Sequence, residues 1–299
     1  MTIQFECPNC NALIAFNAKH IGKRARCQTC GQIFFIPAKD YEKPLKVKPL
    51  PERSDPLPGF YHALFLDSWK LFIRKENAVQ LVFVLAAVCF NFFTTKLYCC
   101  ALIVHFITWG WLLGFYLNII YETAFGLDDL PEIYLGTSIT FLWYVIKPFL
   151  TFCFTMFVVQ FPFIVALILL QNSGVTYSNM WQTHTGFSLL LQILFILGLF
   201  FFPAAVLTTA IGRDISLLRP DYIIKLVFKA FLPYIIVSAL LTCAALIEMN
   251  TTQYDYSAHR STGLTAANLA INLAVQFAAI FAMRSIGLLF RHYSCCLKW

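Results

Sequence analysis

The stretch that decides the fold is residues 187–211, FSLLLQILFILGLFFFPAAVLTTAI, which contains no charged side chain. It belongs to a longer charge-free run, 148–212, which is long enough for two membrane crossings joined by a turn. A helix needs about 20 apolar residues to cross a bilayer core of roughly 30 Å. Further charge-free runs lie at 77–95, 97–121, 230–247 and 261–283. Together these runs predict an all-α polytopic membrane protein.

The predicted membrane domain covers residues 77–299. We expect six spans in it, near 77–95, 98–120, 148–170, 187–211, 229–249 and 265–288. The composition agrees, because 59% of the residues are hydrophobic and only 12% are charged. A soluble protein has roughly 45–50% and about 25%, respectively. The first 40 residues are polar and Cys-rich, so we expect no cleaved signal peptide and a first span that serves as an anchor.

The distribution of basic residues predicts the orientation. Lys and Arg accumulate on the cytoplasmic side of membrane proteins. With the N-terminus inside, the outer loops between the six predicted spans contain only Lys96 and Arg260. The inner segments hold the other twenty of the 22 basic residues. We therefore expect both termini in the cytoplasm.

Two CxxC pairs mark the N-terminal segment, Cys7 with Cys10 and Cys27 with Cys30. Sixteen residues separate the pairs, a spacing typical of zinc sites in which two turns place four thiolates around one tetrahedral Zn²⁺. Four Cys ligands close the coordination shell, so we expect one structural Zn²⁺. Disulfides would need an oxidising compartment, and a redox CxxC would need a βαβ unit. We expect His20 to be a solvated loop residue rather than a ligand.

The same segment resembles a known family. Ile3–Cys10, Gly22–Cys27 and Cys30–Phe34 are similar to a short bacterial zinc ribbon that begins larger proteins, many of them membrane-bound. The resemblance covers residues 1–37. It implies a small β-type ribbon in a bacterial cytoplasm that serves as a binding module, and it brings no catalytic residues. Short strand-like pieces at Leu13–Phe16 and Gln32–Ile36 fit this expectation.

A linker and an amphipathic segment connect the ribbon to the first span. Residues 38–58 are rich in Pro and Lys, which predicts an extended tether that can also attract anionic lipid. Residues 59–76 predict a juxtamembrane amphipathic helix at the lipid interface, with Phe60, Leu64, Leu71 and Phe72 on one broad face.

Few ionisable residues lie in the predicted spans. Asn268, Asn272 and Gln276 recur at every fourth position, so they share one face of the last span. We interpret this polar stripe as hydrogen-bonding contact between helices, with a polar substrate path as the alternative. His105 is the one imidazole clearly at depth in the predicted spans. We expect it to be hydrogen-bonded at a helix interface, and the alternative is a functional role.

The loop after the second span carries Asp128, Asp129 and Glu132. We expect these carboxylates to form a solvated helix-initiating cap rather than a cation site or an acid–base pair. The apolar stretch 133–146 is too short to cross a membrane, which predicts an interfacial or re-entrant helix. The Gly114–Ile120 segment and the Leu130-Pro131-Glu132 turn resemble an uncharacterised family of bacterial multi-pass membrane proteins, a resemblance that implies no activity.

These observations favour a non-enzymatic, membrane-anchored interaction or assembly protein of the bacterial cytoplasmic membrane. Its expected partners are membrane lipid and a cytoplasmic protein bound by the zinc ribbon, and we favour protein over nucleic acid. One alternative is a small-molecule transporter or channel that uses the polar stripe. Another is a lipid-modifying enzyme that uses the 128–132 acidic turn with His105 or His62.

Overall fold

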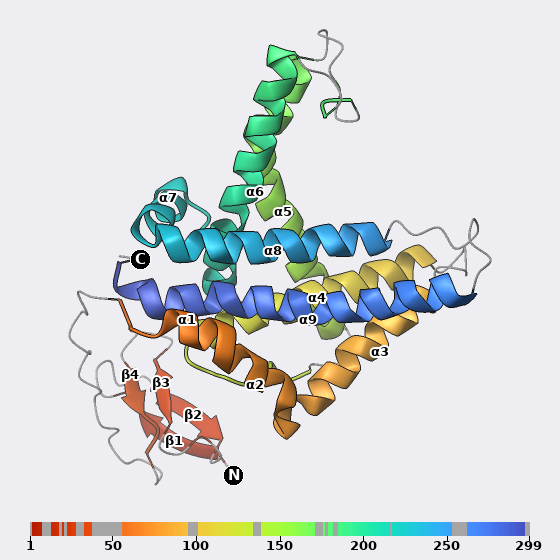
Figure 1. The fold of residues 1–299 in the computed structure, drawn as a ribbon. Coiled ribbons are helices and arrows are strands. Elements are labelled where there is room, and N and C mark those ends of the chain that lie inside the picture. The colour runs from red at the N-terminus through yellow and green to blue at the C-terminus, as the bar shows by residue number, and fades with distance from the viewer. Residues whose placement is uncertain are drawn as a thin grey trace. The chain divides into compact units, whose positions relative to one another are not determined.

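The structure is a computed structural model that divides into two compact units, Met1–Ser54 and Asp55–Trp299 (Figure 1). It describes residues 2–7, 13–17, 20, 23–27, 33–37, 56–94, 101–133, 139–170, 176, 179–181, 185–213, 215, 217–252 and 262–296.

The N-terminal unit contains two antiparallel hairpins. Strand β1 (Thr2–Glu6) pairs with β2 (Leu13–Asn17), and β3 (Arg24–Arg26) pairs with β4 (Ile33–Phe35). In β1, Phe5 is buried between exposed Gln4 and Glu6, which is the period-two alternation of a strand with one covered face. Strands β2 and β4 lie at the two strand-like pieces predicted from the sequence, whereas β1 and β3 were not predicted.

The second unit is built from long apolar helices. Among the described residues, six helices are long and apolar enough to cross a membrane, which confirms the predicted number. They are α3 (Ala78–Thr94), α4 (Ala101–Ala124), α5 (Ile139–Leu169), α6 (Gly186–Gly212), α8 (Phe231–Thr252) and α9 (Thr262–Tyr293). A shorter helix, α7 (Pro220–Lys229), which the sequence analysis did not predict, begins with proline at its first position.

Helix α5 begins nine residues before the predicted span. The separate interfacial helix expected within 133–146 is therefore wrong for residues 139–146, which are the first turns of α5. Pro148 and Pro162 both lie inside this helix without ending it. Proline is tolerated in such helices where neighbouring groups compensate for the lost hydrogen bond.

Two glycines of α4 allow α5 to approach closely. A Cβ atom at Gly110 would lie 2.5 Å from Val145 Cγ1, and one at Gly114 would lie 3.1 Å from Pro148 Cγ. Small residues four positions apart on one helix face bring two helix backbones together in this way. The start of α5 is thus fixed by contact with α4.

Helix α9 lies at the centre of the packing in this unit. It packs against α4 and α8, while α5 packs along α6, as Figure 1 shows. Near the C-terminal end of α9, residues 282–289 are all buried. The last span therefore forms the core of the domain rather than a lipid-facing edge.

The amphipathic segment before the first span consists of α1 (Phe60–His62), the π-helical turn η2 (Ala63–Asp67) and α2 (Ser68–Ile73), followed by the 3₁₀ turn η3 (Lys75–Asn77). Its apolar face packs on α9: the Trp69 and Phe281 rings are 5.7 Å apart, and the Phe72 and Phe277 rings are 5.3 Å apart. The Leu57 backbone N–H donates a hydrogen bond of 2.9 Å to the His292 carbonyl oxygen. The rest of the predicted linker up to residue 55 lies outside the described residues.

Candidate functional site

The two hairpins place one cysteine of each CxxC pair in the same small core. Cys7 follows β1 and Cys27 follows β3, and the two side chains are 1% and 2% exposed. They form one cluster with Phe5, Phe34 and Ile36, in which the Phe5 and Phe34 rings are 5.3 Å apart. Cys10 and Cys30, the predicted second ligand of each pair, lie outside the described residues. His20 is exposed.

The polar stripe of α9 is buried at all three positions. Gln276 accepts a hydrogen bond from the Tyr116 hydroxyl of α4 and donates one of 3.2 Å to Glu248 Oε1 of α8. Asn272 donates to the backbone carbonyl of Asn268, 3.0 Å away on its own helix. Gln276 thus joins α9 to both α4 and α8.

His105 lies on another part of α4. Its side chain is exposed, and its Nδ1 is 3.3 Å from Asn91 Oδ1 on α3. The Trp109 ring is 5.9 Å away. The contacts of His105 thus join α4 to α3, whereas those of Gln276 join α9 to α4 and α8.

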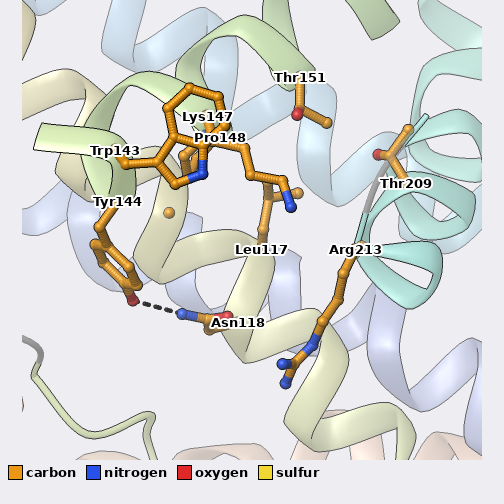
Figure 2. Close-up of a pocket in the computed structure, with 11 residues that line it drawn as sticks. Leu117, Asn118, Trp143, Tyr144, Lys147, Pro148, Thr151, Thr209 and Arg213 are labelled. Carbon is orange, nitrogen blue, oxygen red and sulfur yellow. Dashed lines mark hydrogen bonds between the residues drawn. The ribbon is translucent and has the colours of Figure 1, made fainter. Parts of the chain in front are cut away.

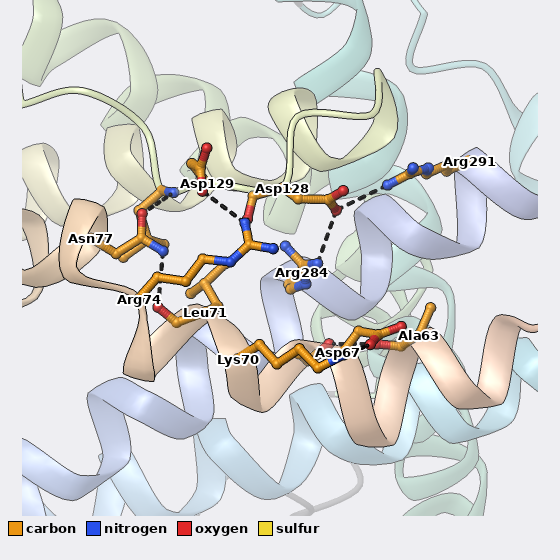
Figure 3. A network of polar contacts seen from close by, with 12 residues as sticks. Ala63, Asp67, Lys70, Leu71, Arg74, Asn77, Asp128, Asp129, Arg284 and Arg291 are labelled. Carbon is orange, nitrogen blue, oxygen red and sulfur yellow. Dashed lines mark hydrogen bonds and ion pairs between the residues drawn. The ribbon is translucent and has the colours of Figure 1, made fainter.

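A network that the sequence analysis did not predict surrounds the acidic turn. It consists of Arg74, Asp128, Asp129, Arg284 and Arg291, and is called here the arginine–aspartate network (Figure 3). Asp128 Oδ1 accepts hydrogen bonds from Arg284 Nη2 and Arg291 Nη1, each at 3.0 Å. Arg74 Nη1 donates to Asp129 Oδ1 at 2.9 Å and to the Asp128 carbonyl at 3.2 Å. The expected solvated cap is therefore wrong for Asp128.

A buried asparagine holds the same turn from the other side. Asn77 is fully buried, and its Nδ2 donates to the Leu71 carbonyl at 2.9 Å. Its Oδ1 accepts from the Leu130 N–H, also at 2.9 Å. One side chain thus joins the end of the amphipathic segment to the loop after α4.

Arg284 is the most enclosed member of the network. Its side chain is 4% exposed, against 34% for Arg291 and 42% for Arg74. Among the residues that the structure describes, its Nε and Nη1 have no hydrogen-bond partner. A buried donor without a partner costs about 1–3 kcal/mol, and a charged one costs more. This guanidinium therefore keeps hydrogen-bonding capacity that the described protein groups do not use.

Arg284 lines a cavity of about 400 Å³, called here the arginine cavity, between the amphipathic segment and α9. Lys70, Arg74 and Arg291 also line it, together with Asp67 and Asp128. Lys70 donates to Asp67 Oδ1 at 2.7 Å, and this bond, with a second one from His62, lowers the pKa of the Asp67 carboxyl.

A second cavity, of about 370 Å³, lies between α4, α5 and α6 and is called here the α4–α6 cavity. Figure 2 shows Lys147 of α5, Asn118 of α4 and Arg213, which directly follows α6, on its lining. Asn118 Nδ2 donates to the Tyr144 hydroxyl at 2.6 Å. The Arg213 guanidinium lies 4.0 Å from the centre of the Tyr121 ring, so part of its charge is held by a cation–π contact.

Comparisons with protein-family models, with curated proteins and with solved structures gave no match to this chain. The six apolar helices define the class of the chain as a multi-pass membrane protein.

Proposed function

We propose that the chain is a membrane-anchored interaction protein, in which a zinc-stabilised ribbon at residues 1–37 binds a cytoplasmic protein and the six-helix domain holds it at the membrane. The observation that carries the proposal is the burial of Cys7 and Cys27 in one small core. The two cysteines occupy equivalent positions, each directly after the first strand of a hairpin. In this proposal the two CxxC turns meet at one tetrahedral zinc ion.

The size of this core supports a structural zinc ion. Among the residues of this unit that the structure describes, the cluster has five buried members, and two of them are the cysteines themselves. A domain of about 37 residues buries too little apolar surface to offset the conformational entropy of folding, and domains of this size commonly rely on a metal or on disulfides. Zinc binding contributes roughly 10–16 kcal/mol in comparable fingers. In this proposal Cys10 and Cys30 complete the coordination shell.

The proposal places the ribbon in the cytoplasm of a bacterium, with the spans in the cytoplasmic membrane. The excess of basic residues in the segments predicted to be inner supports this orientation. A reducing cytoplasm also keeps the four thiols available for metal rather than for disulfides.

The membrane domain acts as an anchor and assembly unit in this proposal, without enzymatic activity. Gln276 hydrogen-bonds groups on two other helices, which supports a structural use of the polar stripe. Asp128 Oδ1 accepts hydrogen bonds from both Arg284 and Arg291, and an oxygen that two guanidinium groups already occupy is poorly placed to exchange a proton with a substrate. His62, the alternative partner suggested for the acidic turn, lies 3.1 Å from Asp67 instead.

One observation favours the transporter alternative. The α4–α6 cavity has two cationic side chains, Lys147 and Arg213, and would suit a small anionic solute. Uptake of such a solute by proteoliposomes should then fall when Lys147 is replaced by Gln. Equal uptake by wild type and variant would remove this cavity from the transport path.

Cross-linking in cells tests the interaction proposal. Partners of the full-length wild type are identified by mass spectrometry and compared with those of a Cys27→Ser/Cys30→Ser variant at matched abundance. The control is Cys243→Ser, which changes an exposed thiol of α8 and leaves both CxxC pairs intact. We expect specific partners to disappear only in the double variant, together with the bound zinc measured on the purified protein. An unchanged partner set after loss of zinc would overturn the proposal.

A further inference from the structure

We propose that the arginine cavity binds a phosphate group, carried either by a lipid headgroup or by a soluble molecule. The proposal concerns the membrane domain alone, so it does not depend on zinc or on a partner of the ribbon.

The charge on the lining favours an anion. Four cationic side chains line the cavity, Lys70, Arg74, Arg284 and Arg291, against the two carboxylates Asp67 and Asp128. Asp129 adds a third carboxylate nearby through its pair with Arg74. The cavity and its ion pairs therefore keep an excess of positive charge, which an anion would neutralise.

The geometry of the arginines favours phosphate among anions. Arg284 and Arg291 both donate to the same oxygen of Asp128, so neither forms a two-pronged pair with the two oxygens of that carboxylate. A guanidinium is best satisfied by two parallel hydrogen bonds to adjacent oxygens, and a tetrahedral phosphate offers such pairs to more than one arginine at once. Figure 3 shows Arg74, Arg284 and Arg291 approaching Asp128 from different directions. Their convergence provides the several donors that such an anion requires.

Arg284 supplies the unused donors. Its Nε and Nη1 lack a hydrogen-bond partner among the described residues, and the side chain belongs to the cavity lining. Both atoms are buried, and a ligand oxygen in the cavity would give this guanidinium the hydrogen bonds that the described protein groups do not supply. The net gain from that contact is large because the donors are already removed from water.

The place of the cavity suits a headgroup. It lies between the amphipathic segment and the C-terminal part of α9, and it has apolar side chains on its lining, including Leu57 and Leu288. Trp69 and Ile73 on the same segment are 58% and 81% exposed, as expected for a segment that meets lipid. An anionic lipid could place its phosphate in the cavity with its chains along these side chains.

Thermal unfolding of the full chain in an uncharged detergent tests the proposal. Tryptophan fluorescence reports the midpoint temperature of unfolding. In the first titration, sodium phosphate replaces sodium chloride at constant ionic strength. In the second, dihexanoyl phosphatidylglycerol is added to the protein in sodium chloride. A ligand that binds the folded state raises the midpoint with its concentration, which gives an apparent dissociation constant. Stabilisation by both probes assigns the site to phosphate from any source, and stabilisation by the lipid alone assigns it to a headgroup.

Variants connect the effect to the cavity. We expect Arg284→Gln to weaken binding about tenfold or more, since it removes a charged donor. Because Arg284 is buried, Lys70→Gln/Arg74→Gln provides a second test on side chains that are 63% and 42% exposed. The matched control is Lys225→Gln/Lys229→Gln, a pair of exposed cations with the same spacing on helix α7. Absence of stabilisation by either probe, or an equal loss of binding in the α7 control, would overturn the proposal.

Discussion

Arg284 Nη2 and Asp128 Oδ1 lie 3.0 Å apart and join the last long helix to the loop after α4, across 156 positions of the sequence. Asp128 also pairs with Arg291, two turns further along α9. The loop is thus held to the most buried helix of the domain by one carboxylate. The ion pair between Asp128 and Arg284 is therefore expected to stabilise the membrane domain.

Replacing Asp128 by Asn should destabilise the membrane domain. The change leaves the Arg284 guanidinium, 4% exposed, without its anionic partner. Loss of a partner from a buried charge costs several kcal/mol, but Asp128 itself is 40% exposed. We therefore expect a loss of about 1–3 kcal/mol in the free energy of unfolding, measured by titration with SDS from detergent micelles. Asp129→Asn, on a side chain that is 63% exposed, is the control and should cost less than about 1 kcal/mol. Equal losses in the two variants would contradict the role given to Asp128.

Replacing Gln276 by Leu should weaken the association of α9 with α4 and α8 and destabilise the membrane domain. The change removes the hydrogen bonds to Tyr116 and Glu248, and Leu keeps a similar volume. Bonds of this kind between membrane helices are worth about 1–2 kcal/mol together. Asn272→Leu is the comparison, because the Asn272 amide bonds to its own helix. The same SDS titration should rank Gln276→Leu as the more destabilising change, and the reverse order would contradict the assignment.

Replacing Gly110 by Ala should disrupt the contact between α4 and α5. The new Cβ would lie 2.5 Å from Val145 Cγ1 and 2.8 Å from the Val145 backbone oxygen, and backbone cannot yield as a flexible side chain does. Overpacking of this kind costs about 1–3 kcal/mol. Gly186→Ala is a suitable control, since a Cβ there meets nothing within 4 Å. If the two variants unfold at the same temperature in detergent, the close approach of α4 and α5 is not a constraint on stability.

Replacing Phe5 by Ala should unfold the ribbon while leaving the membrane domain intact. Phe5 is fully buried and packs against the Phe16 and Phe34 rings. Removing a buried Phe costs about 3–5 kcal/mol, which is a large share of the stability of so small a core. We expect faster proteolysis of the N-terminal unit and loss of the zinc that is proposed to bind there, with unchanged unfolding of the spans. Glu6→Ala, at an exposed neighbouring position, should match wild type.

The number of spans was predictable because it depends on local composition. A charge-free run of about 20 residues can satisfy its backbone hydrogen bonds in a membrane by forming a helix that crosses it. The start of α5 was not predictable in the same way, since a proline at 148 favours a boundary. In the structure, Gly110 and Gly114 of α4 pack closely against α5 on both sides of this boundary. A contact between residues so far apart in the sequence is not visible in the local pattern from which helices are predicted.

The arginine–aspartate network was missed for a similar reason. Its members are far apart in the sequence, and each taken alone resembles a solvated charge at a membrane surface. One signal was present: Arg284 and Arg291 are seven residues apart, so they share a face of the last helix. Two cations on a helix face that is otherwise apolar require an anionic partner, and the 128–132 turn lies on the same predicted side of the membrane.

The dependence of the acidic turn on α9 also constrains the order in which the chain matures on the ribosome. Asp128 emerges 156 residues before Arg284, a delay on the order of ten seconds at typical rates of protein synthesis. During that interval Arg74 is already synthesised and can hold the turn through the Asp128 carbonyl and Asp129. The two ion pairs of Asp128 therefore form only after the last helix has been synthesised. A chain truncated before α9 would leave the Asp128 carboxylate without either of these arginine partners.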